Sequence, residues 1–208
     1  MKRIGLMGGT FDPIHVGHLV AADAARHALD LETVFFIPSN IPPHKREAPE
    51  ATPEQRFEMV LLATLDHPQF EASRVEVDRP GPSFTIDTLR EFRQMFPEAE
   101  LWFITGADAL LEILTWKDAR ELLTLASFVG ATRPGYPLEK LSQVKEGLGR
   151  LADSRIKVLE VPALAISSRD LRKRVREGRP IRYMVRRLVE RYIYKMGLYG
   201  GRPEGLES

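Results

Sequence analysis

Short apolar runs alternate along the chain with segments of helical periodicity. The runs are rich in Val, Ile and Phe, and each has the length of a buried β-strand. They lie at residues 3–8, 33–38, 73–78, 101–106, 127–131 and 157–161. Alternating strands and helices are typical of an α/β fold, a parallel sheet with helices on both faces. Because such folds bind ligands at the carboxyl ends of their strands, we expect the chemistry in the loops that follow them.

Two segments carry further signals of amphipathic helices. Residues 52–55 (TPEQ) form a capping box with proline at the first helical position, which predicts a helix start. The apolar stripe expected for this helix consists of Phe57, Val60, Leu61 and Leu65. A second stripe predicts a C-terminal packing helix, and its members are Val185, Leu188, Val189, Tyr192, Ile193 and Met196. The proline-rich stretch at 39–52 lacks an apolar period and is expected to be a long binding loop.

Composition narrows the class of protein. A chain of 208 residues without an internal linker fits a single domain, expected over residues 1–199, with a flexible tail at 200–208. The absence of cysteine excludes a disulfide scaffold, a cysteine zinc site and a thiol nucleophile. No apolar run approaches the ~20 residues of a membrane helix, and no signal-peptide pattern follows Met1. We therefore expect a cytoplasmic protein with no membrane partner.

Charge is concentrated near the end of the chain. The segment 168–195 holds eleven cationic and three acidic residues, so its net charge is +8 against +1 for the whole chain. This asymmetry indicates either an anionic partner or a solvated helix face that pairs with acids elsewhere.

The most informative motif is residues 8–19 (GGTFDPIHVGHL), which directly follow the first predicted strand. Its two leading glycines let the backbone approach a ligand closely. A helix is expected to begin near His15, so that His15 and His18 face the same way across its first turn, with room left by Gly17. A helix N-terminus attracts anions, and two imidazoles add donors that can follow charge on a phosphate.

Other interpretations of this motif remain open from the residues alone. Neither the P-loop nor the dinucleotide fingerprint is present. Two histidines at this spacing could bind zinc, but the sequence places no third ligand. They could also be core or capping histidines, which the glycine context disfavours.

A second motif is residues 166–172 (ISSRDLR), which begin the basic helix after the last predicted strand. Ser167 and Asp170 form a capping box, which is a purely structural explanation. The serine hydroxyls, the helix amides and Arg172 could equally hold a polyphosphate.

Four isolated residues also have two interpretations each. Lys45 could reach a phosphate or be an exposed loop lysine, and Thr85 could touch a ligand or cap a helix. Asp108 could accept hydrogen bonds from a ribose or cap a helix. Trp116 could stack on an aromatic ring or fill the core.

Taken in order, these segments resemble the bacterial nicotinate mononucleotide adenylyltransferases. Residues 8–18 are similar to the signature of that family, a variant of the H-x-G-H motif of the nucleotidyltransferase superfamily. The further segments that resemble it are residues 42–45 (PPHK), 83–89 (SFTIDTL), 106–108 (GAD), Trp116, 133–135 (RPG) and 166–168 (ISS). The ordered set is specific and covers residues 1–199. One position departs from the pattern, because Arg169 stands where the superfamily often has threonine.

The resemblance implies a Rossmann-like sheet and a Mg²⁺-dependent reaction of ATP with nicotinate mononucleotide. The products are nicotinate adenine dinucleotide and pyrophosphate, a late step of NAD synthesis. His15 and His18 would act as the catalytic residues by binding the ATP phosphates and stabilising the transition state. The ATP-binding residues implied are Gly8, Gly9, Thr10, Phe11, His15, His18, Gly106, Asp108, Ser167, Ser168 and Arg172. The mononucleotide-binding residues implied are Lys45, Thr85, Trp116 and Arg133.

The expected step is a direct in-line attack that needs no protein nucleophile, with Mg²⁺ held by phosphates and water rather than by a protein site. An adenylyltransferase of another substrate, such as phosphopantetheine, would share the histidines but not residues 83–89. A nucleic-acid-binding module would use the basic segment alone and leave the histidines unexplained. The sequence does not distinguish nicotinate from nicotinamide mononucleotide, and it leaves the oligomeric state open.

Overall fold

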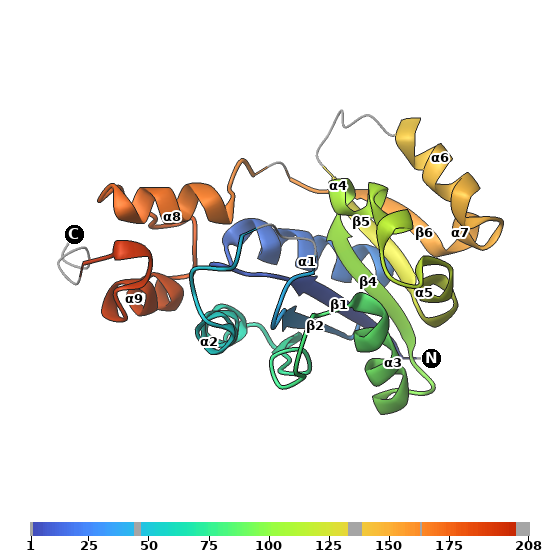
Figure 1. The fold of residues 1–208 in the computed structure, drawn as a ribbon, viewed down its shortest axis with the longest axis horizontal. Coiled ribbons are helices and arrows are strands. Elements are labelled where there is room, and N and C mark those ends of the chain that lie inside the picture. Colours follow the sequence, from blue (N-terminus) through green and yellow to red (C-terminus); the bar gives the residue numbers. More distant parts are fainter. Residues whose placement is uncertain (1, 44–46, 133–138, 163, 203–208) are drawn as a thin grey trace.

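The structure is a computed structural model that describes residues 2–43, 47–132, 139–162 and 164–202. Six parallel strands form one sheet in the order β3-β2-β1-β4-β5-β6 (Figure 1). The strands are β1 (Arg3–Gly9), β2 (Thr33–Pro38), β3 (Phe70–Ala72), β4 (Glu100–Gly106), β5 (Ser127–Thr132) and β6 (Ile156–Glu160). The expected parallel α/β sheet is therefore confirmed.

Helices connect the strands and cover both faces of the sheet. They are α1 (Val16–Leu29), α2 (Pro53–Thr64), α3 (Thr85–Met95), α4 (Ala107–Leu111), α5 (Ala119–Leu125), α6 (Glu139–Leu148), α7 (Leu151–Arg155), α8 (Ser168–Arg176) and α9 (Arg187–Lys195). Two short 3-10 helices lie at Ile113–Thr115 and Leu198–Gly200. In Figure 1, α8 and α9 lie together at one end of the molecule near α2, and α6 and α7 lie at the other end beside β6. No helix in the described ranges is long and apolar enough to span a membrane.

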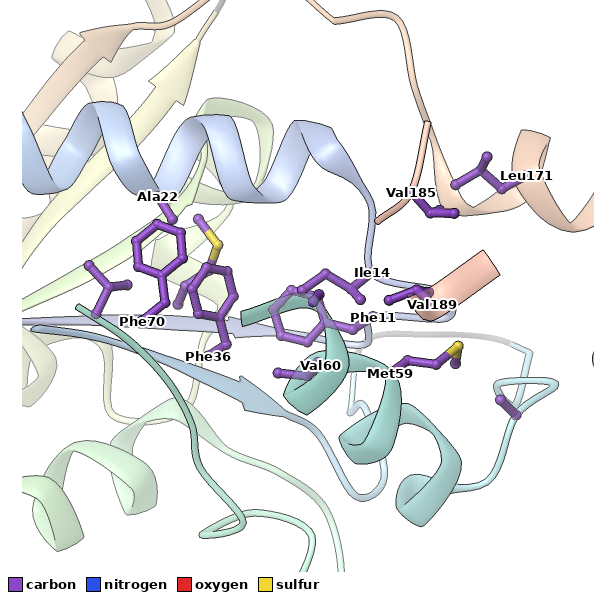
Figure 2. Packing of buried hydrophobic residues seen from close by; sticks show 14 of the residues in the cluster. Phe11, Ile14, Ala22, Phe36, Met59, Val60, Phe70, Leu171, Val185 and Val189 are labelled. Carbon is purple, nitrogen blue, oxygen red and sulfur yellow. The ribbon is translucent and has the colours of Figure 1, made fainter. Parts of the chain in front are cut away.

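Two apolar cores lie on opposite faces of the sheet. One joins the sheet to α1, α2, α8 and α9, and Figure 2 shows Phe36 and Phe70 of this core next to Ala22 of α1. The rings of Phe36 and Phe70 meet edge to face at 5.0 Å. The second core joins the other face to α3, α4, α5, α6 and α7. The sheet is thus buried on both sides, as expected for parallel strands.

The order of the strands creates a crevice at one place. From β1 the chain moves outward through β2 to β3, and from β4 it moves in the opposite direction through β5 to β6. β1 and β4 are neighbours in register, with Met7 opposite Ile104. Their connections diverge, so the space beyond their carboxyl ends is left uncovered, which is where α/β sheets bind ligands.

The prediction of a strand at residues 73–78 is wrong. The third strand is Phe70–Ala72, and its ladder ends where the amide of Ser73 donates to the carbonyl of Phe36 at 2.9 Å. Residues beyond it form a turn in which Arg74 pairs with Glu54 and Asp78. The buried side chain in this turn is that of Glu76, which accepts a hydrogen bond from the hydroxyl of Thr88 in α3.

The capping box of α2 is confirmed, but its predicted buried face is wrong by about one position. Thr52 Oγ1 accepts from the amide of Gln55 at 3.2 Å, and the Gln55 side chain accepts from the amide of Thr52 at 2.9 Å. Leu61 and Leu65 are exposed. The residues of α2 that are buried are Arg56, Met59, Val60, Ala63 and Thr64. The buried face includes Arg56 and Thr64, so it cannot be found from the apolar residues alone.

The C-terminal helix shows a similar difference. α9 packs Val189 and Ile193 inward as expected, but Leu188 and Met196 are exposed. Tyr194 is buried in their place, because this end of the helix packs against the turn at 198–200 rather than along the sheet.

The buried face of α2 can be tested by two substitutions on different faces of the helix. Met59→Ala should lower the free energy of unfolding by about 2–4 kcal/mol, because it removes a fully buried side chain. Leu61→Ala should change it by less than about 0.5 kcal/mol, because Leu61 is exposed. Urea denaturation measures both, and equal losses would contradict the observed orientation of the helix.

Candidate active site

The turn after β1 places two histidines at the first turn of α1. His15 is the N-cap residue, and its backbone amide donates to Nδ1 of His18 at 3.2 Å. The two imidazoles stack with their centroids 3.7 Å apart. Phe11 supports the pair from one side, because its ring meets His18 edge to face at 5.0 Å. The expectation that both histidines face the same way is confirmed.

Glycine at position 17 is required by this arrangement. A Cβ at Gly17 would lie 3.0 Å from Nδ1 of His15, so a larger residue would displace the imidazole. At Gly9, a Cβ would come within 2.9 Å of the Phe11 ring that supports His18. Both glycines therefore keep the imidazoles in place by leaving space for aromatic rings.

Burial indicates the protonation state of His15, and a hydrogen bond indicates the tautomer of neutral His18. His15 is only 8% exposed, and burial lowers its pKa to about 4, so its ring is neutral at physiological pH. Nδ1 of His18 accepts a hydrogen bond, so in the neutral form of His18 the proton is on Nε2. His18 is thereby prepared to donate from Nε2 to an anion.

A cavity of about 500 Å³ opens beside the histidines, beyond the carboxyl ends of β1 and β4. It is lined by Gly8, His15 and His18 on one side and by Gly106 and Asp108 at the end of β4 on the other. These five residues, far apart in sequence, were all expected to bind ATP. The structure brings them together at the switch in strand direction.

A second cavity of about 250 Å³ adjoins the first and shares Gly8 and Thr105 with it. Its lining includes Thr10, Thr85 and Trp116. The half-buried indole of Trp116 contacts Phe103 edge to face at 6.0 Å and still borders the cavity. Trp116 therefore packs against the core and also borders a space large enough for a ligand.

The first turn of α8 holds the loop that carries the histidines. Ser168 Oγ donates to the carbonyl of Pro13 at 2.9 Å, and Arg172 donates to the carbonyl of Asp12 at 2.7 Å and to Glu50 at 2.7 Å. Ser167 caps the helix by accepting from the amide of Asp170 at 3.2 Å. The described lining of the first cavity ends at Ile166, just before these residues.

The basic segment is largely paired with acids. Glu50 binds both Arg172 and Arg176, and Asp170 pairs with Arg174. Arg186 pairs with Asp66 beyond the end of α2. These ion pairs favour the solvated and paired helix face over a nucleic-acid surface.

Two residues near the site, Asp12 and Arg56, were not expected from the sequence. Asp12 is 2% exposed and accepts from the amides of Glu50 and Ala51 and from the hydroxyl of Tyr199, at 2.9, 3.1 and 2.8 Å. It thus ties the long loop and the C-terminal turn to the histidine loop. Arg56 is fully buried and donates to the carbonyls of Thr10 and Ser39, two residues that line the second cavity. The apolar stripe expected from the sequence runs through Phe57, so no periodic signal marked Arg56 as buried.

Two expected ligand-binding residues, Lys45 and Arg133, lie outside the described residues. Across the residues that are described, no three His, Asp or Glu side chains are grouped as a metal site. Zinc at His15 and His18 therefore has no support from a third ligand.

The sequence is similar to those of known proteins over nearly its whole length. Residues 6–174 match the family described as "Cytidylyltransferase-like". A protein of Moorella thermoacetica named "Probable nicotinate-nucleotide adenylyltransferase" is 53% identical over 98% of this chain and 94% of its own length. One of the same name from Thermus thermophilus is 51% identical over 95% and 99%. The chain belongs to the nicotinate-nucleotide adenylyltransferase family.

Solved structures agree with this family at the level of the fold. A Plasmodium falciparum nicotinic acid mononucleotide adenylyltransferase complexed with NaAD has a TM-score of 0.77 over 98% of this chain and 100% of its own, with 18% sequence identity. A second structure of that enzyme, complexed with APC, has a TM-score of 0.75. At such low identity the likeness shows a shared Rossmann-like fold.

Burial of His15 makes stability depend on pH. Unfolded, its pKa is the ordinary 6.5, and folded it is about 4, so between these values the unfolded state binds more protons. Stability is therefore lost as the pH falls through this range. When the pH is lowered from about 7 to about 5, His15 should reduce the free energy of unfolding by about 2 kcal/mol. Urea unfolding at both pH values should show this loss in the wild type but not in His15→Gln. An equal loss in both proteins would contradict the assignment of the titration to His15.

Proposed function

We propose that the protein transfers the adenylyl group of ATP to nicotinate mononucleotide, which yields nicotinate adenine dinucleotide and pyrophosphate in NAD biosynthesis. One observation carries the proposal: two cavities of about 500 and 250 Å³ meet at Gly8, beside the His15–His18 pair at the N-terminus of α1. This arrangement suits two nucleotides whose phosphates must come together. The family of the chain supports the same reaction.

ATP is assigned to the larger cavity. Gly106 and Asp108 would hold the adenosine, because they line the cavity at the end of β4. His15, His18 and the first amides of α1 would bind the phosphates through N–H donors and the helix dipole. Ser167, Ser168 and Arg172 would reach the leaving pyrophosphate from the start of α8. For Arg172 this requires it to leave Glu50, with which it pairs in the structure.

The mononucleotide is assigned to the smaller cavity. Trp116 would stack on the pyridine ring, and the backbone at Thr85 would contact its substituent, since both residues line this space. Gly9 and Thr10 line the smaller cavity and would contact the reacting phosphates, whereas buried Phe11 would act by supporting the ring of His18. Lys45 and Arg133 are proposed to assist in binding the mononucleotide.

The chemical step needs no protein nucleophile. A phosphate oxygen of the mononucleotide attacks the α-phosphorus of ATP, a new P–O bond forms, and the bond to the β-phosphate oxygen breaks with its electron pair leaving on pyrophosphate. His18 Nε2 would donate to an oxygen on the α-phosphorus as negative charge grows there. Acceleration then comes from holding the two phosphates in line and from charge stabilisation.

The residues present fit a Mg²⁺ ion carried by the substrate. Asp108 is the one carboxylate among the described residues that line the larger cavity, and it is assigned to the adenosine, so the ion would be held mainly by the phosphates and by water. When bound, the ion would neutralise charge on the triphosphate. The use of ATP also supports the expectation of a cytoplasmic enzyme.

The reaction itself can be tested by pyrophosphate release. Purified protein with ATP and Mg²⁺ should release pyrophosphate when nicotinate mononucleotide is added, and the product should have the mass of nicotinate adenine dinucleotide. Nicotinamide mononucleotide and phosphopantetheine serve as competing substrates. Release with phosphopantetheine alone, or with none of the three, would contradict the proposal.

The role of His18 can be tested against a second histidine of the same helix. His18→Ala should lower kcat by about 100- to 1000-fold, the usual loss when one transition-state donor is removed. His27→Ala, at the exposed far end of α1, should keep wild-type kinetics. Steady-state kinetics and circular dichroism check both variants, and near-normal turnover of a folded His18→Ala would contradict the assigned role.

A further inference from the structure

A fully buried arginine lies at the junction of the loops that surround the smaller cavity. Arg56 of α2 is 0% exposed, and its guanidinium donates to backbone carbonyls. The acceptors are the carbonyls of Ala51 at 3.2 Å, Thr10 at 2.9 Å, Ser39 at 2.6 Å and Asn40 at 3.0 Å. One side chain therefore joins the ends of β1 and β2 to the start of α2.

Burial of this charge is not offset by a direct ion pair. No salt bridge in the described part of the chain includes Arg56. Burial lowers the pKa of its guanidinium, and the charge of Asp12 opposes that shift from a greater distance. A buried charge is costly unless it is fully hydrogen-bonded. Here four carbonyl dipoles provide the compensation, so the loops that carry them are fixed by the same bonds.

The hydrogen bonds continue from Arg56 to the far wall of the cavity. The amide of Asn40 donates to Ser83 Oγ at 2.8 Å, and its side chain donates to the carbonyl of Arg79 at 2.9 Å. Ser83 lines the cavity just before α3, the helix that begins at Thr85. We call this set of bonds, from Arg56 through Asn40 to Ser83 and to the carbonyl of Arg79, the loop frame.

The loop frame contacts the smaller cavity and not the larger one. Thr10, Ser39 and Ser83 all line the smaller cavity, whereas the larger cavity is bordered at the end of β4 by Gly106 and Asp108, which form no part of the frame. A weakened frame should therefore disturb the mononucleotide more than ATP, because Thr10 is the one member of the frame assigned to the reacting phosphates.

We propose that Arg56 is a positioning residue that shapes the mononucleotide site by holding the carbonyls of Thr10, Ser39 and Asn40 on one guanidinium. This inference rests on the proposed function. Arg56 does not touch the substrate in this account, and it acts through the loops that do. Lysine cannot replace it, because one ammonium group lacks the planar fork that reaches four carbonyls.

The test is Arg56→Lys, with Arg93→Lys as a matched control. Arg93 also donates to backbone carbonyls, those of Pro97, Ala99 and Leu125, but these lie just before β4 and β5, at the amino ends of the strands. We expect Arg56→Lys to raise the KM for nicotinate mononucleotide by about tenfold, the effect of one or two lost hydrogen bonds. The KM for ATP should stay within about twofold, and Arg93→Lys should change neither constant.

Thermal unfolding of both variants separates folding from positioning. Both should lose stability, so a loss shared with the control does not explain a KM change confined to Arg56→Lys. Unchanged KM for the mononucleotide in a folded Arg56→Lys would overturn the inference, and so would equal rises for both substrates. If the wild type itself releases no pyrophosphate with nicotinate mononucleotide, the proposed function fails, which is a distinct result.

A second variant decides the matter if Arg56→Lys does not fold. Asn40→Ala removes the bond to the carbonyl of Arg79 and keeps the buried guanidinium. It should raise the KM for the mononucleotide by about threefold without changing that for ATP, because one link of the loop frame is lost. An unchanged KM for the mononucleotide in Asn40→Ala would then overturn the inference.

Discussion

The opposite directions in which the chain leaves β1 and β4 are the constraint on which the site depends. Right-handed crossovers place α1 and α2 on one face of the sheet and α3 to α7 on the other. No crossover helix can then cover the junction between the two strands. The amino-terminal turn of α1 points its amides and its two stacked imidazoles into that gap. The topology thus makes this place suited to an anion before any single side chain is considered.

Loops at such a junction must still be held in position, because connecting segments are usually the mobile part of a domain. Two buried polar residues hold them here. Asp12 collects donors from the long loop and from Tyr199, and Arg56 collects carbonyls from the ends of β1 and β2. Inside the protein, satisfied polar networks of this kind specify one arrangement of the backbone. The loops of the candidate site are thus fixed by buried side chains, while the residues that line the cavities stay available to ligands.

Features set by neighbouring residues were predictable from the sequence, and those set by distant partners were not. The start of α2 follows from a capping box that closes within residues 52–55, and the pairing of His15 with His18 follows from helical spacing. Residues 73–78 alternate like a strand, yet Glu76 is buried for reasons that lie in α3. The burial of Arg56 could not be predicted, because its carbonyl partners come together only after folding.

In the proposed reaction two nucleotides meet at Gly8, with the adenosine on the β4 side and the pyridine ring beside Trp116. A crystal structure with nicotinate mononucleotide and a non-hydrolysable ATP analogue would show both ligands in place. We expect the triphosphate against His15 and His18 in the larger cavity and the pyridine ring in the smaller one. Exchange of the two ligands between the cavities, or phosphates bound away from both histidines, would contradict it.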